Sequence, residues 1–469
     1  MSDMPRYDIL VLGSGEAGKY LAWTMAKAGR CVAVIERRWI GGSCPNIACL
    51  PSKNVIYSAH VAALLRRGAE FGIAPGLVQV DMKTVRGRKR KMVDDLVAIH
   101  LENYAASGAE LIMGEGRFVG PKTIEVRAHD GSTRVLAGDR VYLNLGTRAA
   151  IPDVPGLVQA APLTHVEALE LGYLPDHLIV LGGGYVGLEL AQPMRRFGSR
   201  VTVVEQGSQI AGHEDSDVAQ AVLQRFEDEG IAVLLNTRAL AVEGRSGKQI
   251  RLRVETPNGT QTIEASDILV AAGRRPNTQD IGLDTVGIEV DARGYIKVNE
   301  RLETTAADVW ALGDCAGSPQ FTHVSFDDFR VARDNLNGGN RTTRNRLVPY
   351  CMFTDPEVGR VGLNETEARR AGIAYRIARI PLAAVLRTRT LSETYGFLKA
   401  LIAADSDQIL GFTAVGTGAS ELIAVVQVAM AASMPYTALR DTILTHPTMA
   451  EGLTILFANE PTLPAQGHF

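Results

Sequence analysis

The chain has 469 residues, enough for roughly three domains at about 100–200 residues each. Hydrophobic residues make up 46% of the sequence and charged residues 22%, which excludes a disordered or fibrous chain. The 49 basic and 52 acidic residues give a formal net charge of −3, so the charge favours neither a nucleic acid nor an anionic membrane as a partner.

The first predicted elements form a βαβ unit, with a strand over 7–12, a helix over 16–28 and a second strand over 32–36.

Residues 1–8 lack the basic and apolar segments of a signal peptide. The chain has five cysteines, and so small and uneven a number does not fit a secreted disulfide framework. We therefore expect a cytoplasmic protein.

A dinucleotide-binding pattern stands at the end of the first strand. Gly13, Gly15 and Gly18 form a G-x-G-x-x-G motif, and Glu36 ends the next strand. In such a unit the glycines permit a tight turn and a close approach of a pyrophosphate, and the acidic residue accepts hydrogen bonds from a ribose. The alternative is a glycine-rich turn, but the strand, helix and acidic residue together favour binding.

Two cysteines, Cys44 and Cys49, follow shortly after Glu36. In a cytoplasmic chain such a close pair is redox-active, or half of a metal site, more often than a structural disulfide. A zinc site needs about four ligands, and no other Cys/His pair nearby has metal-binding spacing. We therefore expect a redox-active pair and no metal site.

The residues that follow carry weaker signals. The basic run 86–91 is predicted to be a solvated helix face rather than a nucleic-acid patch, because the chain as a whole is nearly neutral. The remaining cysteines, Cys31, Cys315 and Cys351, are expected to be small core residues.

A second dinucleotide-binding pattern begins at residue 177. It combines a strand over 177–181, a helix over 186–197 and a strand over 200–205 with the glycines Gly182, Gly184 and Gly187. Glu205 ends the last strand, where it would bond a free ribose 2′-hydroxyl and repel a 2′-phosphate. Residues 206–209 offer no arginine for such a phosphate. This pattern predicts NADH as the cofactor, with NADPH less favoured.

The C-terminal part follows a different pattern. Strands over 396–402 and 409–415 and helices over 420–434 and 450–457 predict a separate α+β unit from about residue 348. The apolar run 422–434 is shorter than the roughly 18–20 residues of a transmembrane helix, so we expect a buried helix and no membrane association. The predicted fold class is α/β: two Rossmann-like dinucleotide-binding domains followed by an α+β dimerisation domain.

Several motifs in order give the chain a specific resemblance. Residues 41–53, Gly-Gly-Ser-Cys-Pro-Asn-Ile-Ala-Cys-Leu-Pro-Ser-Lys, resemble the active-site signature of the flavoprotein disulfide reductases, which include lipoamide dehydrogenase, glutathione reductase and mercuric reductase. Segments 273–277, 311–314, 353–359 and 445–452 are similar to later motifs of that family. The resemblance covers essentially the whole chain and favours a mercuric-reductase-like branch.

The resemblance implies a domain order and a set of cofactor contacts. An FAD-binding domain would occupy 1–150 and continue as a central part over 274–347; an NAD(P)-binding domain would occupy 151–273, and an interface domain 348–469. The implied FAD-binding residues are Gly13, Gly15, Gly18, Glu36, Gly42, Ser43, Lys53, Gly116, Gly146, Asp314 and Thr322. The implied NAD-binding residues are Gly182, Gly184, Tyr185, Gly187, Glu205 and Gly273.

The resemblance also implies catalytic roles. Cys49 is similar to the thiol nearest the flavin, and Cys44 to the thiol that attacks substrate. Lys53, paired with Glu189, resembles the lysine beside flavin N5. Tyr185 resembles a side chain that covers the flavin until nicotinamide enters.

An acid–base pair is implied as well. His446, oriented by Glu451, would serve the active site of the other subunit in a homodimer with shared sites.

The electron acceptor stays open at this point. The implied function is transfer of electrons from NADH through FAD to the Cys44–Cys49 disulfide and on to a small-molecule disulfide or a thiophilic metal ion. The chain departs from usual mercuric reductases because its C-terminal segment has no cysteine pair and Asn144-Leu-Gly-Thr147 replaces Ala-Thr-Gly. Alternatives are dihydrolipoamide dehydrogenase proper, a Hg(II), Cu(II) or quinone reductase, and a flavin-linked redox sensor. A flavin monooxygenase or a simple transhydrogenase would not need the two cysteines.

Overall fold

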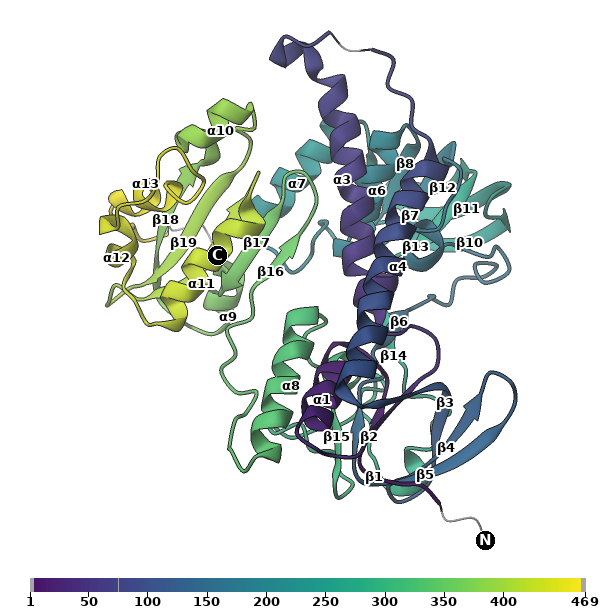
Figure 1. Cartoon of the computed structure of the whole chain (residues 1–469). Coiled ribbons are helices and arrows are strands. Elements are labelled where there is room, and N and C mark those ends of the chain that lie inside the picture. The colour runs from purple at the N-terminus through teal and green to yellow at the C-terminus, as the bar shows by residue number, and fades with distance from the viewer. Residues whose placement is uncertain (1–3, 75, 465–469) are drawn as a thin grey trace.

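The computed structural model describes residues 4–74 and 76–464, so residues 1–3 of the N-terminal segment and residues 465–469 of the cysteine-free C-terminal segment lie outside it. Figure 1 shows three parts: a lower unit around β1, an upper unit around β7, and a C-terminal domain beside the upper unit. Long helices α3 (Cys49–Arg66) and α4 (Met82–Ser107) run along the first two units.

The first unit is built on a mostly parallel sheet. Strands β3 (Glu110–Gly120), β2 (Val32–Glu36), β1 (Arg6–Leu12), β5 (Thr133–Leu143) and β15 (Val309–Ala311) pair in that order, all parallel. β4 (Thr123–Ala128) joins β3 and β5 by antiparallel pairing. Helices α1 (Glu16–Lys27) and α8 (Thr322–Leu336) lie side by side against this sheet (Figure 1). This arrangement places the loop after β1 beside the segment that follows β15.

The second unit repeats the parallel design. Its sheet has the order β13 (Asp267–Val270), β7 (His177–Leu181), β8 (Arg200–Val204) and β9 (Ala232–Leu234). Every residue of β7 is buried, as expected for a parallel strand covered on both faces. Helix α6 (Tyr185–Phe197) follows β7, and α7 (Ser216–Asp228) follows β8. The short helix α5 (His165–Ala168) precedes β7, and an antiparallel sheet of β10 (Arg238–Arg245), β11 (Gln249–Thr256) and β12 (Gly259–Ala265) completes the unit.

The chain crosses between the two units twice, and the crossings pair with each other. β6 (Thr147–Ala149) and β14 (Arg274–Pro276) form a two-stranded antiparallel ladder. The two segments in which the chain passes between the units therefore lie side by side.

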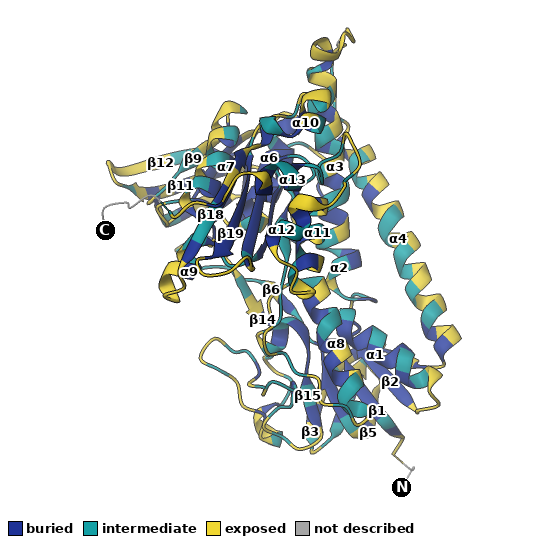
Figure 2. Cartoon of the chain, turned by 90° about the vertical axis from the view of Figure 1, so that its left-hand side faces the viewer, coloured by how far each residue is buried: buried dark blue, intermediate teal, exposed yellow. Residues whose placement is uncertain are grey.

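The C-terminal domain is an antiparallel sheet with helices. Its strand order is β16 (Tyr350–Met352), β17 (Val358–Gly362), β20 (Ile409–Val415), β19 (Phe397–Ala403) and β18 (Tyr375–Pro381). Its helices are α9 (Glu365–Arg370), α10 (Leu386–Leu391), α11 (Ala419–Ala431), α12 (Tyr436–Asp441) and α13 (Gly452–Ala458). Every residue of β19 is buried (Figure 2), whereas the edge strand β18 is buried at only three of its seven residues. The α/β fold class with two dinucleotide-binding units and an α+β domain is confirmed.

Predicted element bounds agree closely with the structure. The strands predicted over 32–36, 177–181 and 409–415 have these bounds in the structure. The helix predicted to end at residue 434 ends at Ala431. None of the helices among the described residues has an apolar stretch long enough to cross a membrane.

The prediction of a solvated basic face over 86–91 was wrong at Lys89. This residue lies on α4 with 1% of its surface exposed, and its ammonium bonds the carboxylate of Glu170 from the second unit. Arg90 pairs with the same carboxylate, and Arg86 donates to the carbonyl of Glu170. The run therefore attaches α4 to the second unit, because a buried ammonium needs a carboxylate within bonding distance.

The cysteine predictions were partly wrong. Cys315 is buried, as expected, and Cys351 is half-buried, but Cys31 is exposed. Cys31 directly precedes β2, and its backbone N–H donates to Asp8.

Candidate active site

The two cysteines of the signature lie together where the first unit meets α3. Cys44 lies on the short helix α2 (Ser43–Asn46), and Cys49 is the first residue of α3. Both are free thiols that share a hydrogen bond. Sγ of Cys49 lies 3.2 Å from Oγ1 of Thr322, the first residue of α8. The pair is thus held between the signature loop and the second segment of the first unit.

The local environment separates the acidities of the two thiols. The hydrogen bond from Cys44, together with the Thr322 hydroxyl and the charge of Lys53, lowers the pKa of Cys49 to about 6 although burial opposes this. The same hydrogen bond, with burial added, raises the pKa of Cys44 above its usual range. The N-terminus of an 18-residue helix further favours an anion at Cys49. One thiolate, on Cys49, is therefore the stable charge state of the reduced pair.

The signature loop lies directly on the first glycine motif. A Cβ built on Gly42, whose φ is +83°, would be 2.6 Å from Cα of Gly15. Asn46 fixes the loop by donating from Nδ2 to the carbonyls of Ile40 and Gly42. Glycine is required at residue 42 because no other side chain fits against the motif below it.

Lys53 and Glu189 form an ion pair between the two units. Lys53 Nζ lies 2.5 Å from Oε2 of Glu189, and Oε1 of Glu189 accepts the backbone N–H of Phe353 at 2.8 Å. Lys53 stands one turn after Cys49 on α3, and Glu189 is on α6. Three parts of the chain therefore position one cation beside the cysteine pair.

The first glycine motif is closed by side chains. Glu36, which the sequence analysis assigned to a ribose, accepts the backbone N–H of Ser14 at 2.9 Å. Asn144, which the sequence analysis treated only as a departure from the family, accepts the N–H of Gly18 at 3.0 Å and donates to the carbonyl of Leu312 at 2.9 Å. Asn144 is 7% exposed and joins the motif to the end of β15.

In the second glycine motif a carboxylate also accepts a backbone N–H, and the space beside the motif is more open. Glu205 accepts the N–H of Gly183 at 2.6 Å and that of Gly207 at 2.7 Å. A Cβ built on Gly184, the residue before α6, would meet no atom within 4 Å. The N-terminus of α6 therefore faces free space with no side-chain cap.

The remaining predicted contacts of the first unit surround the crossing. Asp314 accepts the hydroxyl of Thr147 at 2.6 Å, and Arg274 donates to that hydroxyl at 2.7 Å. Gly146 and Gly273 have φ of +63° and +110°, with no atom within 4 Å of a Cβ built on either. Gly116 lies on β3, further from these groups, where a Cβ would lie 3.2 Å from the side chain of Ile35.

His446 and Glu451 form the expected pair. Nδ1 of His446 lies 2.9 Å from Oε1 of Glu451, and 59% of the histidine side chain is exposed. Figure 1 shows α12 and α13, the helices that flank His446, at the outer edge of the C-terminal domain and well away from α3. Within one chain the structure therefore separates this pair from the cysteines.

Tyr185 lies in a polar and aromatic cluster that the sequence analysis did not find. Its hydroxyl donates to Oε1 of Glu214 at 2.6 Å, and its ring stacks on Tyr350 with 5.6 Å between centroids. Phe321, the residue before α8, also stacks on Tyr350, with 5.6 Å between centroids. Glu214 and Tyr350 belong to no motif, and nothing in their local sequence indicates a site.

Comparison with known proteins gives the family. The profile for pyridine nucleotide-disulphide oxidoreductases matches residues 7–328, and that of the family's dimerisation domain matches residues 348–456. The chain belongs to the pyridine nucleotide-disulphide oxidoreductase family. As an enzyme of this family it passes electrons from a pyridine nucleotide through FAD to a disulfide. The match to the dimerisation domain supports a homodimer.

Individual members of the family match over nearly their whole length. The probable pyridine nucleotide-disulfide oxidoreductase RclA of Escherichia coli is 35% identical over 461 residues, covering 97% of this chain and 99% of that protein. Its structure as a Cu(II) complex, described as an HOCl-induced flavoprotein disulfide reductase, superposes with a TM-score of 0.88 at 33% identity, covering 97% and 99% of the two chains. Mercuric reductase of Streptomyces lividans is 33% identical, covering 96% and 95%.

The residues present fit the two cofactors of this pyridine nucleotide-disulphide oxidoreductase. Each glycine motif opens a helix with no side-chain cap, which leaves first-turn N–H groups for a pyrophosphate. A carboxylate stands at the end of the following strand in both units, Glu36 in the first and Glu205 in the second. The open space at Gly184 is where a nucleotide would approach the second unit.

Proposed function

We propose that this enzyme prefers NADH and passes its electrons through FAD to the Cys44–Cys49 disulfide, then to a small-molecule disulfide or a thiophilic metal ion. The observation that carries the proposal is the unequal acidity of the two thiols. Cys49 has its pKa lowered to about 6, and Cys44 has its pKa raised. A pair of this kind keeps one thiolate beside the flavin and leaves the other thiol for exchange with substrate.

The residues divide the work of electron transfer. When bound, FAD takes a hydride from the nicotinamide and delivers two electrons to the disulfide. Lys53, held by Glu189, places a positive charge where negative charge develops, and Thr322 steadies the thiolate of Cys49 by its hydroxyl. Cys44 carries out thiol exchange with the acceptor.

The proposed cofactor contacts follow the two glycine motifs. In the first unit these are Gly13, Gly15, Gly18, Glu36, Gly42, Ser43, Gly116, Gly146, Asp314 and Thr322. In the second they are Gly182, Gly184, Tyr185, Gly187, Glu205 and Gly273. Domain boundaries near residues 150, 273 and 347 belong to the same proposal.

Proton transfer is assigned to His446 of the opposite subunit. Its ring is oriented by Glu451 and exposed, and it lies away from the cysteines of its own chain. A carboxylate behind a histidine fixes its tautomer and supports its action as a base. The pair would deprotonate Cys44 and later protonate the leaving thiol of a disulfide substrate.

The preference for NADH rests on Glu205. Its carboxylate is fixed at the strand end by two backbone N–H groups, where it can accept a ribose 2′-hydroxyl. A 2′-phosphate at this place would meet a negative charge and no arginine in residues 206–209.

Reduction of Cu(II) is a second candidate, because a related flavoprotein disulfide reductase has been solved as a Cu(II) complex. The adjacent thiols Cys44 and Cys49 are soft ligands of the kind that binds copper and mercury. One NADH supplies two electrons, which would reduce two Cu(II) to Cu(I).

Anaerobic titration with NADH tests the assignment of the thiols. Two-electron reduction is expected to give a long-wavelength charge-transfer band from the Cys49 thiolate to oxidised flavin. The band should be present above about pH 6 and disappear as the pH falls below that value, because protonation removes the thiolate. Cys44→Ser should keep such a band and Cys49→Ser should lose it.

Turnover against lipoamide, glutathione disulfide, a quinone, Cu(II) and Hg(II) then identifies the acceptor. Slow reduction of every acceptor would favour a redox sensor instead.

The shared site has a separate test: heterodimers of His446→Ala and Cys44→Ser subunits contain one intact site if His446 serves the other subunit. Such heterodimers should recover about half the wild-type activity, whereas each parent homodimer is nearly inactive. Heterodimers as inactive as their parents would show that His446 does not act across subunits.

A further inference from the structure

One buried carboxylate, that of Glu214, receives two tyrosine hydroxyls on the same oxygen. Tyr185 donates to Oε1 at 2.6 Å and Tyr350 donates to it at 2.5 Å. Glu214 is 4% exposed. Burial raises the pKa of both tyrosines, so both phenols stay protonated and act as donors. Two domains meet at this oxygen, since Tyr185 opens α6 of the second unit and Tyr350 begins β16 of the C-terminal domain.

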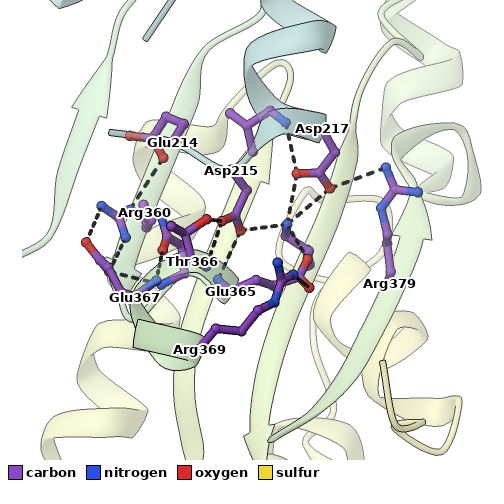
Figure 3. A network of polar contacts seen from close by, with 12 residues as sticks. Glu214, Asp215, Asp217, Arg360, Glu365, Thr366, Glu367, Arg369 and Arg379 are labelled. Atoms are coloured by element: carbon purple, nitrogen blue, oxygen red, sulfur yellow. Dashed lines mark hydrogen bonds and ion pairs between the residues drawn. The ribbon is translucent and has the colours of Figure 1, made fainter. Parts of the chain in front are cut away.

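Arg360 of the C-terminal domain balances the charge of the Glu214 carboxylate and fixes its position. Figure 3 shows Arg360 lying between Glu214 and Glu367. Arg360 lies 3.4 Å from Oε2 of Glu214 and also donates to the hydroxyl of Tyr350. Arg360 thus places a positive charge beside the carboxylate and fixes the hydroxyl of Tyr350 that bonds it.

The residue after Glu214 anchors its backbone. Asp215 accepts the N–H groups of Glu365 and Thr366 at 3.0 Å each, at the start of α9. It also pairs with Lys399, which is 1% exposed and bonds Asp217 and Glu365 as well (Figure 3 shows Asp215, Asp217 and Glu365 converging). The acceptor for Tyr185 is therefore a rigid one.

Tyr185 stands on the path between the two ends of the nicotinamide cofactor. It directly follows Gly184, where the pyrophosphate would bind, and it shares a face of α6 with Glu189, one turn further on. Glu189 holds Lys53 beside the cysteine pair. A nicotinamide that reached from Gly184 toward Lys53 would therefore pass Tyr185.

We propose that Glu214, supported by Tyr350 and Arg360, is a latch that holds the ring of Tyr185 closed over the nicotinamide site. This inference rests on the proposed placement of the nicotinamide at the second glycine motif. Glu214 and Tyr350 are positioning residues, since they act on the cofactor through Tyr185. Binding of NADH must break the bond from Tyr185 to Glu214 and separate its ring from Tyr350.

The latch lowers the affinity for nucleotide by the fraction of molecules that are unlatched. When only that fraction can bind, the apparent dissociation constant rises in inverse proportion to it. A hydrogen bond to a charged acceptor shifts such an equilibrium by about tenfold or more. Without nucleotide the closed ring shields the flavin side from other electron acceptors.

The variant Tyr185→Phe tests the latch, because it keeps the ring and removes only the hydroxyl. Calorimetric titration of the FAD-loaded enzyme with NAD⁺ should show binding about tenfold tighter than in the wild type. Stopped-flow reduction of the flavin at low NADH should be faster by a similar factor. Unchanged or weaker NAD⁺ binding by Tyr185→Phe would overturn the latch.

A second variant and a matched control make the test specific. Glu214→Ala should also tighten NAD⁺ binding, and adding Tyr185→Phe to it should give no further gain, because both changes break one bond. Independent, additive effects of the two substitutions would contradict the latch. The control is Tyr395→Phe, which removes a hydroxyl that crosses the same two domains to the carbonyl of Ala221. It should bind NAD⁺ as the wild type does, and tightening in this control would also count against the latch.

The wild type separates failure of the latch from failure of the proposed function. If NADH reduces the wild-type flavin but Tyr185→Phe changes neither binding nor rate, only the latch is wrong. If NAD⁺ does not bind the wild type and NADH does not reduce its flavin, the proposed function and the latch both fail.

Discussion

A Cβ atom built on Gly15 in the first dinucleotide-binding unit would lie 2.5 Å from Oδ1 of Asn144, whereas one built on Gly184, at the same place of the second motif, would meet no atom within 4 Å. Behind the first motif stands Asn144; the equivalent residue behind the second is Ala271, whose carbonyl lies against Gly182 as that of Asn144 lies against Gly13. The signature loop also covers the first motif at Gly42 and has no counterpart over the second.

This difference matches the two cofactors. FAD stays bound through the catalytic cycle, and the first motif is closed and braced by side chains around it. The nicotinamide nucleotide must enter and leave at every turnover, and the second motif, where we propose that it binds, is open to solvent at Gly184 beside the proposed latch on Tyr185. The same loop design thus serves retention in one unit and exchange in the other.

The largest effect should come from adding a side chain at Gly15, where the structure leaves no room for one. In Gly15→Ala the new methyl group displaces the carboxamide of Asn144, which then loses its bond to Gly18. We expect the purified protein to hold FAD in less than about a tenth of its molecules, measured as the ratio of flavin to protein absorbance. A fully yellow Gly15→Ala protein would contradict the closed geometry of the first motif.

Removing the side chain of Asn144, which braces the first motif, should make that motif resemble the second. Asn144→Ala leaves the N–H of Gly18 and the carbonyl of Leu312 without their partner in a buried site. Each unsatisfied buried group costs about 1–3 kcal/mol, so FAD should bind more weakly and urea unfolding should show a loss of stability in this range. The matched change in the second unit is already present as Ala271, and wild-type flavin affinity in Asn144→Ala would show that the brace has no effect.

Filling the open space at Gly184 should act on the nucleotide alone. Gly184→Ala introduces a methyl group that meets no protein atom but stands before the N-terminus of α6. The melting temperature and flavin content should stay at wild-type values, while KM for NADH rises on the order of tenfold, as expected for loss of charge-assisted N–H bonds to a phosphate. Loss of flavin in this variant would mean that the two motifs are not independent.

The smallest effect is expected at the strand end of the second unit. Glu205→Ala removes the carboxylate that we assign to the ribose, so affinity for NADH should fall and repulsion of the 2′-phosphate of NADPH should disappear. The ratio of kcat/KM for NADH to that for NADPH should narrow by about threefold to tenfold, given the usual size of one hydrogen bond. A wild type that favours NADPH would refute the preference.

Local patterns were enough to predict much of this molecule. The two glycine motifs, the acidic residues that follow them and the cysteine pair all lie within short stretches whose spacing is set by strand and helix geometry, and their strands were predicted almost to the residue. Glu36 and Glu205, which were predicted to bind ribose hydroxyls, each also bond the backbone of their motif.

Contacts between distant segments could not be predicted in this way. Lys89 meets Glu170, Asn144 meets Leu312, and Tyr350 meets Glu214, and each pair joins residues that are far apart in the sequence. Lys89 has the local pattern of a solvated lysine, and only the packing of α4 on the second unit makes it buried. The acidic partners carry no motif, so their role depends on the assembled fold.

The ion cluster around Lys399 has a consequence for how this protein can be recombined or cut. Its ammonium comes from the C-terminal domain, while two of its three carboxylates, Asp215 and Asp217, come from the second unit. Separating the two parts would break the pairs from Lys399 to Asp215 and Asp217 and leave those two acids without their cation. The C-terminal domain is therefore not a portable module: a chimaera that exchanges it with a relative has to exchange residues 214–217 with it.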